Sequence, residues 1–489
     1  MRDLVLTLFI FGMLPYAFMR PVVGLYLWAW ISYMNPHRLT WSYAYSFRFN
    51  YFVAIITILG VVFFWRKREK IPSTGPVFLL TLFFIWVCLS TLLAFSPGGA
   101  WIDFVRFFKI YLMLLITFLT VGSRRSITIL VVIIAVSIGF FGIKGGVFTI
   151  LTGGQFHILG PEDSFFYDNN TFALAEVMVI PLFMFIRTQL QNRWLRLFVL
   201  ICTVLAVIAV IGSYSRGGLV GLMMVIFFFW LRTPGKIKLT IFIPLVMVVI
   251  FTSMPEKWQD RMSALAESVT VIKPVKDFIE NSPNLFERRS VFDESNNPFN
   301  LDATDEQSVE TEESRLLADM SVQGRFQAWN FAWNLALDRP FFGGGFHSFT
   351  QRAFDLYSPG VVRRDAHSIY FEVMAEQGFG GLFVWMLLHF SVFRLQNSIM
   401  RRTQNNKEMS WAHELARYVG IGLMGYYSAG AFLGLAYFDL PYHFLAILII
   451  LQKIVNKELS SGQVPEQRDR FPYVSPPRKQ GSVERMTTD

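Results

Sequence analysis

Charged residues and cysteine are scarce in this sequence. Asp, Glu, Lys and Arg together make up 16% of its 489 residues, whereas apolar residues make up 53%. An average soluble domain carries about 25% charged residues, so the composition argues against a soluble enzyme. Both cysteines, Cys88 and Cys202, lie inside apolar runs, which argues against a disulfide framework or a thiolate metal site.

Apolar runs long enough to cross a bilayer recur along the chain. Because a transmembrane helix needs roughly 20 mostly apolar residues, we predict an all-α polytopic membrane protein with about 12 transmembrane helices, about 13 being the alternative. The first run lacks a small-residue cleavage site, so no cleavable signal is expected. This run, residues 4–34, is interrupted by Pro15, Arg20 and Pro21 and is predicted to be one kinked span or a short hairpin. The other spans are expected near residues 50–65, 77–95, 102–121, 127–150, 171–187, 194–212, 217–231, 238–253, 367–393, 415–435 and 441–454.

Basic and non-basic connections alternate between these spans. The connection 158–170, for example, contains no Lys or Arg. Under the positive-inside rule the basic connections face the cytoplasm, so topology accounts for the net charge of +9 and no nucleic-acid partner is expected. Lys and Arg gather in the connections at 66–70, 124–125, 187–196, 232–238 and 394–407, and in the tail after Lys453.

The same alternation predicts four parts. They are an N-terminal transmembrane region (1–253), a periplasmic, mainly helical loop domain (254–366), a C-terminal transmembrane region (367–454) and a disordered cytoplasmic tail (455–489). Within the loop domain we expect an amphipathic surface helix, an acidic insert at 293–319, a helix over 324–340 that Pro340 stops, and a glycine turn at 341–349.

Three ionisable residues lie at predicted boundaries between lipid and water. Arg216 follows a tight link in "SYSRGG", Arg325 opens the helix of the loop domain, and His367 begins the next span. Taken singly, each residue has a structural interpretation: Arg216 as a snorkelling anchor, Arg325 as a surface residue and His367 as a hydrogen-bonded helix start.

The order of three motifs resembles a known family. "SRGG", then "GR" with an aromatic helix ending in "DRPFFGGG", then "HSIYFEVMAEQGFGGL" is similar to the O-antigen ligase and O-antigen polymerase superfamily of bacterial envelope glycosyltransferases. The whole chain looks most like the O-glycosylation ligases that accompany exosortase systems. The resemblance implies that Arg216, Arg325 and His367 match the essential outer-face residues of that family.

The resemblance also implies the reaction and its place. Such a ligase lies in the bacterial inner membrane and transfers a glycan from undecaprenyl pyrophosphate to a hydroxyl of a lipid, protein or glycan acceptor on the periplasmic face. Arginine grips a pyrophosphate bidentately, and a histidine is suited to remove the proton of the acceptor hydroxyl. Direct attack inverts the anomeric carbon and needs one base.

No metal or other cofactor is expected. The first outer loop, residues 35–50, contains no acidic residue that could hold a metal ion. Asp302 and Asp305 have a metal-like spacing but lie in the acidic insert. Arginines at the pyrophosphate would take the place of the metal.

Further residues are candidates for substrate binding, each with a structural alternative. Asp168 with the two asparagines that follow is also the start of a helix, for which it would be the N-cap, and His347 is the alternative base. A lipid-linked glycan transporter or flippase is the competing class of function, and a polysaccharide polymerase of the same superfamily is the other alternative. The candidates for substrate binding are Arg363, Arg364, Asn169, Asn170 and Lys144.

Overall fold

The structure is a computed structural model that describes residues 1–232 and 323–461, together with Thr240 and Pro255. Three expected features lie outside these residues: the span at 238–253, the first part of the loop domain with its acidic insert, and the chain after residue 461.

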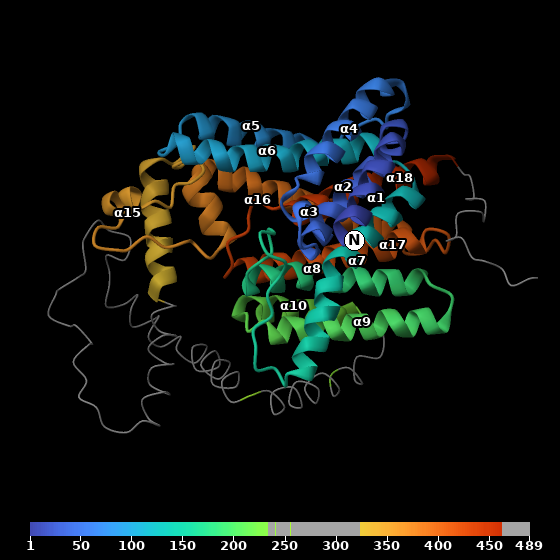
Figure 1. The fold of residues 1–489 in the computed structure, drawn as a ribbon. Coiled ribbons are helices and arrows are strands. Elements are labelled where there is room, and N and C mark those ends of the chain that lie inside the picture. The colour runs from blue at the N-terminus through green and yellow to red at the C-terminus, as the bar shows by residue number, and fades with distance from the viewer. Residues whose placement is uncertain (233–239, 241–254, 256–322, 462–489) are drawn as a thin grey trace, which may run out of the picture.

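The described residues form helices and no β-strand, which confirms the all-α prediction for this part of the chain (Figure 1). Two short 3-10 helices, η1 (Pro36–Leu39) and η2 (Trp65–Lys67), and an α-helix over residues 323–338 accompany the labelled α-helices. The labelled helices are α1 (Arg2–Met19), α2 (Pro21–Met34), α3 (Tyr43–Ser46), α4 (Phe49–Phe63), α5 (Gly75–Leu92), α6 (Pro97–Thr120), α7 (Arg124–Leu151), α8 (Asn169–Gln189), α9 (Arg193–Gly212), α10 (Arg216–Arg232), α15 (Gln351–Tyr357), α16 (Ile369–Thr403), α17 (Ser410–Gly430) and α18 (Asp439–Ser461).

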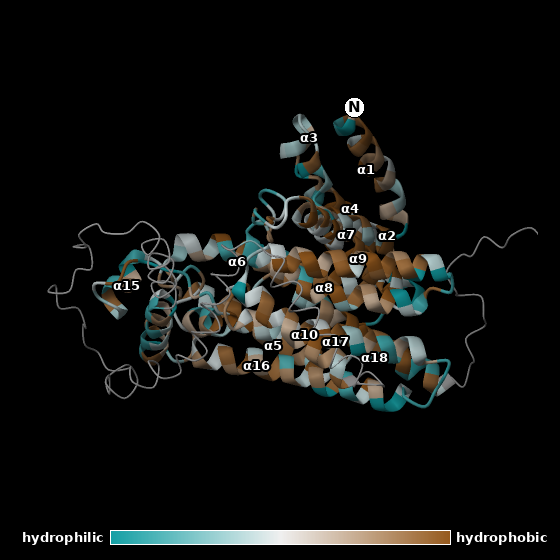
Figure 2. Ribbon diagram, turned by 90° about the horizontal axis from the view of Figure 1, so that it is seen from below, coloured by the Kyte–Doolittle hydropathy of each residue, from teal (hydrophilic) through white to brown (hydrophobic). Residues whose placement is uncertain are grey.

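Six of these helices are long and apolar enough to cross a membrane: α1, α5, α7, α8, α9 and α16. Shorter apolar helices occupy Pro21–Met34, Phe49–Phe63 and Arg216–Leu231. Large apolar side chains such as Phe198 and Phe390 are exposed on the outside of the bundle, as lipid-facing residues are. Figure 2 shows predominantly hydrophobic bundle helices, with hydrophilic residues toward their ends and around α15. The chain is therefore a multi-pass membrane protein, and the total of about 12 spans remains a prediction.

The N-terminal apolar run is broken into two helices. α1 ends at Met19, Arg20 leaves the helical region at φ −132° and ψ 86°, and Pro21 begins α2. Proline suits the first position of a helix because it needs no hydrogen bond there. At the other end of the chain, α18 continues to Ser461, beyond the predicted end of its span at residue 454.

The basic connections meet at one end of the bundle. The backbone N–H of Glu69, after α4, donates to the carbonyl of Leu119 at the end of α6, and Nζ of Lys453 from α18 lies 2.7 Å from Oε2 of Glu69. The guanidinium of Arg124 lies 4.9 Å from the ring centre of Trp411, which follows the basic connection after α16. The predicted alternation of charge thus corresponds to a segregation of basic connections in space.

The helix over 323–338 ends just before Pro340, as predicted, and the glycine turn that follows docks onto α16. The docking site is a break in α16 at Gly378, whose φ of 70° and ψ of −179° suit only glycine. Gly344 N–H donates to the carbonyl of Ala375 at 2.8 Å, and Gly380 N–H donates to the carbonyl of Pro340 at 3.1 Å. The break therefore joins the outer unit, residues 323–358, to the membrane region through backbone hydrogen bonds.

A small core fixes the outer unit above this break. Phe331 of the 323–338 helix stacks on Phe354 of α15, with ring centres 4.0 Å apart. Met374 and Ala375 of α16 are buried in the same cluster. The first turns of α16, which follow His367, are thus packed on one side by the outer unit.

Cysteine labelling tests the predicted sidedness. In a Cys88→Ala/Cys202→Ala background, we expect a membrane-impermeant maleimide to label Gln155→Cys in intact cells, and Gln404→Cys only after permeabilisation. Gln155 and Gln404 are both exposed and lie at opposite ends of the bundle. Labelling of Gln404→Cys in intact cells would contradict the topology.

Candidate functional site

The link between α9 and α10 is tied to the start of α8. Asn169 Nδ2 donates to the carbonyl of Ser213 at 2.9 Å, and the Ser215 hydroxyl donates to Oδ1 of Asn170 at 2.8 Å. Arg216 is the first residue of α10 and is half-buried. Both asparagine side chains therefore hold the segment that presents Arg216. Their role in substrate binding stays a prediction.

The predicted N-cap at the start of α8 is confirmed. One carboxylate oxygen of Asp168 accepts from the N–H groups of Asn170 at 2.9 Å and Thr171 at 3.3 Å. In the link itself, Tyr214 has a φ of 58°, a left-handed conformation that lets one residue reverse the chain between two helices. Local side-chain capping and one strained residue thus make the tight turn expected before Arg216.

Arg325 and His367 are brought together by an aromatic contact between their segments. The indole N–H of Trp329 donates to the carbonyl of Ala366 at 2.8 Å. The same indole stacks on Phe371 of α16, with ring centres 4.8 Å apart and planes at 4°. This contact holds the start of the 323–338 helix beside His367, which itself has a left-handed φ of 44°.

The charges around His367 come from three parts of the chain. His367 is exposed at the surface, yet the protein atoms around its imidazole remove part of its hydration, and this lowers its pKa from the usual 6.5. The Arg325 guanidinium lowers the pKa further, whereas the carboxylates of Asp365 and Asp168 raise it. The imidazole is therefore predominantly neutral near pH 7.

Arg325 itself is held partly out of water. Burial lowers the pKa of its guanidinium, which nevertheless stays charged because arginine starts near 12.5. Its Nε is buried and makes no hydrogen bond within the part of the chain that the structure describes. An arginine with an unused buried donor is suited to an anionic ligand.

The segment between α17 and α18 connects Arg216 to His367. Leu433 packs against Gly217, where an added Cβ would lie 2.8 Å from Leu433 Cγ. The next residue, Gly434, lies so close to His367 that a Cβ there would be 3.7 Å from the His367 backbone nitrogen. Arg216 and His367 therefore lie beside one segment, and Arg325 lies near His367, at the end of the bundle opposite the basic connections.

The other predicted substrate-binding residues differ in how close they lie to Arg216, Arg325 and His367. Arg364 packs with its guanidinium against Gly324, directly before Arg325. Arg363 is exposed, and its backbone N–H donates to Oε1 of Gln351 in α15 at 2.8 Å. Lys144 is exposed on α7, and no hydrogen bond or ion pair joins it to the three central residues within 1–232 and 323–461.

A second ionisable cluster lies beside this site and was not predicted from the sequence. Nδ1 of His347 is 3.3 Å from Oδ2 of Asp103 in α6, and the His347 backbone N–H donates to Oε1 of Glu376 at 3.2 Å. Glu372, one turn earlier on α16, accepts from the N–H of Ala436 at 3.0 Å. The sequence signal for this cluster was a pair of carboxyl groups spaced one helical turn apart at the start of an apolar helix.

A metal-binding group is not found among the described residues: no three His, Cys, Asp or Glu side chains there lie close enough to hold an ion. Asp302 and Asp305, the acidic pair with metal-like spacing, lie outside them.

Comparison with protein families agrees with the motifs. Residues 201–386 match the model of a family described as O-antigen ligase, and residues 1–191 match the model of a family of unknown function. The first match contains Arg216, Arg325 and His367, and it supports the O-antigen ligase superfamily and a role in glycan transfer. No curated protein matches the chain.

The charges around His367 predict how one substitution moves its titration. Asp365 raises the pKa of His367, so Asp365→Asn should lower the imidazole midpoint further below 6.5. NMR titration of the purified protein with labelled histidine measures this midpoint. Asp163→Asn, which removes an exposed carboxylate paired with Arg38, is the matched control and should leave it in place. A midpoint that stays or rises in Asp365→Asn would contradict the arrangement of charges.

Proposed function

We propose that the chain is a glycosyltransferase that moves a glycan from undecaprenyl pyrophosphate to an acceptor hydroxyl, at the periplasmic face of the bacterial inner membrane. The observation that carries this proposal is the gathering of Arg216, Arg325 and His367 at the end of the bundle away from the basic connections. All three lie within the residues that match the O-antigen ligase model.

The two arginines would bind the pyrophosphate of the donor. A guanidinium offers two parallel N–H groups to a phosphate, and its attraction grows as the leaving group gains charge. Arg216 stands at the first residue of α10, where the backbone N–H groups of the helix start also favour an anion. Arg325 adds a partly buried charge near His367, and Arg364 lies next to it.

His367 would act as the base. Its lowered pKa keeps the imidazole neutral near pH 7, so one ring nitrogen is free to accept a proton. The acceptor oxygen gives its proton to this nitrogen and forms a bond to the anomeric carbon, while the bond from that carbon to the pyrophosphate oxygen breaks. Undecaprenyl pyrophosphate leaves with the electron pair, and the anomeric configuration is inverted.

The periplasmic loop domain, residues 254–366, would receive the acceptor. The outer unit belongs to this domain, supplies Arg325 and packs against the start of α16. We include the narrower assignment, an O-glycosylation ligase associated with an exosortase system, in this proposal. The acceptor is then a lipid, protein or glycan hydroxyl, and no metal ion takes part.

Conservative substitution of the arginines tests the pyrophosphate clamp. Arg216→Lys or Arg325→Lys keeps the positive charge but loses the paired donors, so we expect transfer to fall about 100-fold or more. Turnover of lipid-linked glycan by purified variants in proteoliposomes measures this loss, with Arg352→Lys on α15 as the exposed control. A chelator should leave the wild-type rate unchanged. If a chelator abolished transfer and magnesium restored it, a metal ion and not the two arginines would stabilise the pyrophosphate.

Removal of the base tests His367. His367→Ala should keep donor binding and lose about 100- to 10,000-fold in turnover, because a hydroxyl is a poor nucleophile at neutral pH. His347→Ala, on the neighbouring cluster, should have a milder effect. Donor movement across the bilayer with no transferred glycan would favour a flippase instead, and a product that keeps the donor's anomeric configuration would rule out a single inverting step.

A further inference from the structure

A cavity of about 210 Å³ opens at the end of the bundle that carries the basic connections. Its wall includes three cations, Arg20, Lys67 and Arg68, and one acid, Glu69. Apolar side chains, among them Phe64, complete the lining. The lining thus combines cationic and apolar side chains.

The break between α1 and α2 explains why a charge interrupts the first apolar run. Arg20 lies between the two helices, where the chain leaves the helical conformation before Pro21. This break packs on α4 at Gly60, where an added Cβ would lie 2.5 Å from the carbonyl oxygen of Phe18. The close approach sets Arg20 beside the end of α4, where Lys67 and Arg68 follow.

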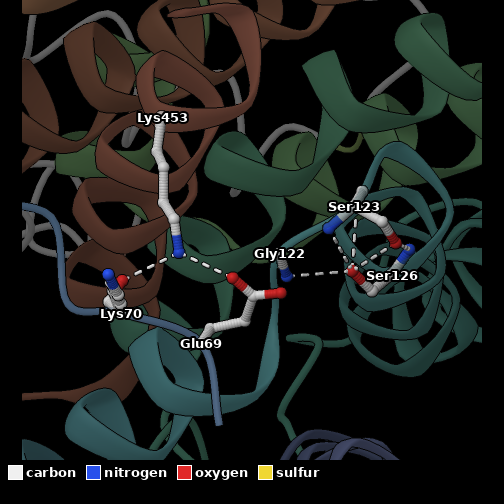
Figure 3. A network of polar contacts seen from close by, with 6 residues as sticks. All are labelled: Glu69, Lys70, Gly122, Ser123, Ser126 and Lys453. Atoms are coloured by element: carbon white, nitrogen blue, oxygen red, sulfur yellow. Dashed lines mark hydrogen bonds and ion pairs between the residues drawn. The ribbon is translucent and has the colours of Figure 1, made fainter. Parts of the chain in front are cut away.

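The acid in the wall already has a partner. Nζ of Lys453 lies 2.7 Å from Oε2 of Glu69 and also donates to the carbonyl of Lys70 at 2.8 Å (Figure 3). On its other side Glu69 packs against Gly122, where a Cβ would lie 2.0 Å from its carboxyl carbon. Glu69 therefore does not neutralise the cations of the cavity.

The three cations make no ion pair within the described residues. Each lies near an aromatic ring instead: Arg20 at 5.7 Å from the centre of Tyr16, Lys67 at 5.4 Å from Phe64, and Arg68 at 3.5 Å from that of Trp65. Such contacts orient a cation without satisfying its hydrogen-bond donors. All three side chains are exposed, so their remaining donors are accessible to an anionic ligand.

We propose that this cavity binds the phosphate headgroup of an anionic glycerophospholipid. Two guanidinium groups and an ammonium suit a phosphodiester, and basic pockets between membrane helices are suited to anionic headgroups. The apolar wall and the exposed side chains of Val62 and Phe63 at the end of α4 lie where acyl chains would run. The site is distinct from the glycan-transfer site, which lies at the other end of the bundle, and it does not depend on that function.

Lipid binding to the full-length protein in neutral detergent tests the site. Native mass spectrometry compares phosphatidylglycerol with phosphatidylcholine of the same acyl chains, and the wild type should prefer the anionic lipid. The triple substitution Arg20→Gln/Lys67→Gln/Arg68→Gln should weaken phosphatidylglycerol at least about tenfold and leave phosphatidylcholine unchanged. Equal affinity for both lipids in the wild type would overturn the proposal.

Two further variants separate a built cavity from general surface charge. Arg394→Gln/Arg401→Gln/Lys407→Gln removes three cations from another basic connection and should change affinity less than about twofold. Thr120→Phe keeps every cation but fills the cavity, whose wall includes Thr120, and should weaken binding as the triple substitution does. The cavity would not be the binding site if the Arg394→Gln/Arg401→Gln/Lys407→Gln control lost as much affinity for phosphatidylglycerol as the first triple substitution. Unchanged affinity in Thr120→Phe would contradict the proposal in the same way. If millimolar inorganic phosphate displaced the lipid, the ligand of the cavity would be free phosphate and not a lipid headgroup.

Discussion

The hydrocarbon interior of a bilayer offers no hydrogen-bond partner, so the helices of this protein must satisfy their terminal backbone groups at or beyond the membrane edge. The capping groups therefore gather there: Asp168 caps α8, and the hydroxyl of Ser215 accepts from the N–H of Gly218 at the start of α10. At the other end of the bundle, Ser123 and Ser126 cap α7 reciprocally. Polar side chains and helix termini therefore share the same two thin zones, and the candidate site lies in the zone away from the basic connections.

Positive charge has different origins in the two zones. At one end, cations such as Arg124 fill short connections, as the positive-inside rule predicts. At the other end, topology gives no reason for cations, yet Arg216 and Arg325 lie there, each at a helix start and partly withdrawn from solvent. Under the proposed function, cations held there by side-chain capping or aromatic packing bind the anionic leaving group.

Local sequence signals predicted much of this structure. The length of apolar runs predicted most helices, Asp168 predicted an N-cap, and Pro340 with the glycines after it predicted a helix end and a turn. What local signals missed depends on contacts between distant segments. The pairing of His347 with Asp103 joins the glycine turn to α6, and no spacing within either segment encodes it. The proposed roles of Arg216, Arg325 and His367 came from the family resemblance in motif order. The proximity of Arg216 and His367 depends on the α17–α18 link, which carries no motif of its own.

The break of α16 at Gly378 has a consequence for how this protein can change over generations. The outer unit is attached there through main-chain groups, with the hydroxyl of Ser90 in α5 adding a side-chain hydrogen bond to the carbonyl of Phe342 at 2.8 Å. Attachment through the main chain requires glycine at a few positions, such as Gly343 and Gly378, and places little constraint on the side chains that face outward. The outward surface of the unit is thus free to diversify, while the helix that begins just after His367 keeps its position. Under the proposed function, new acceptor preferences can therefore arise by drift in one exposed unit without change to the membrane helices.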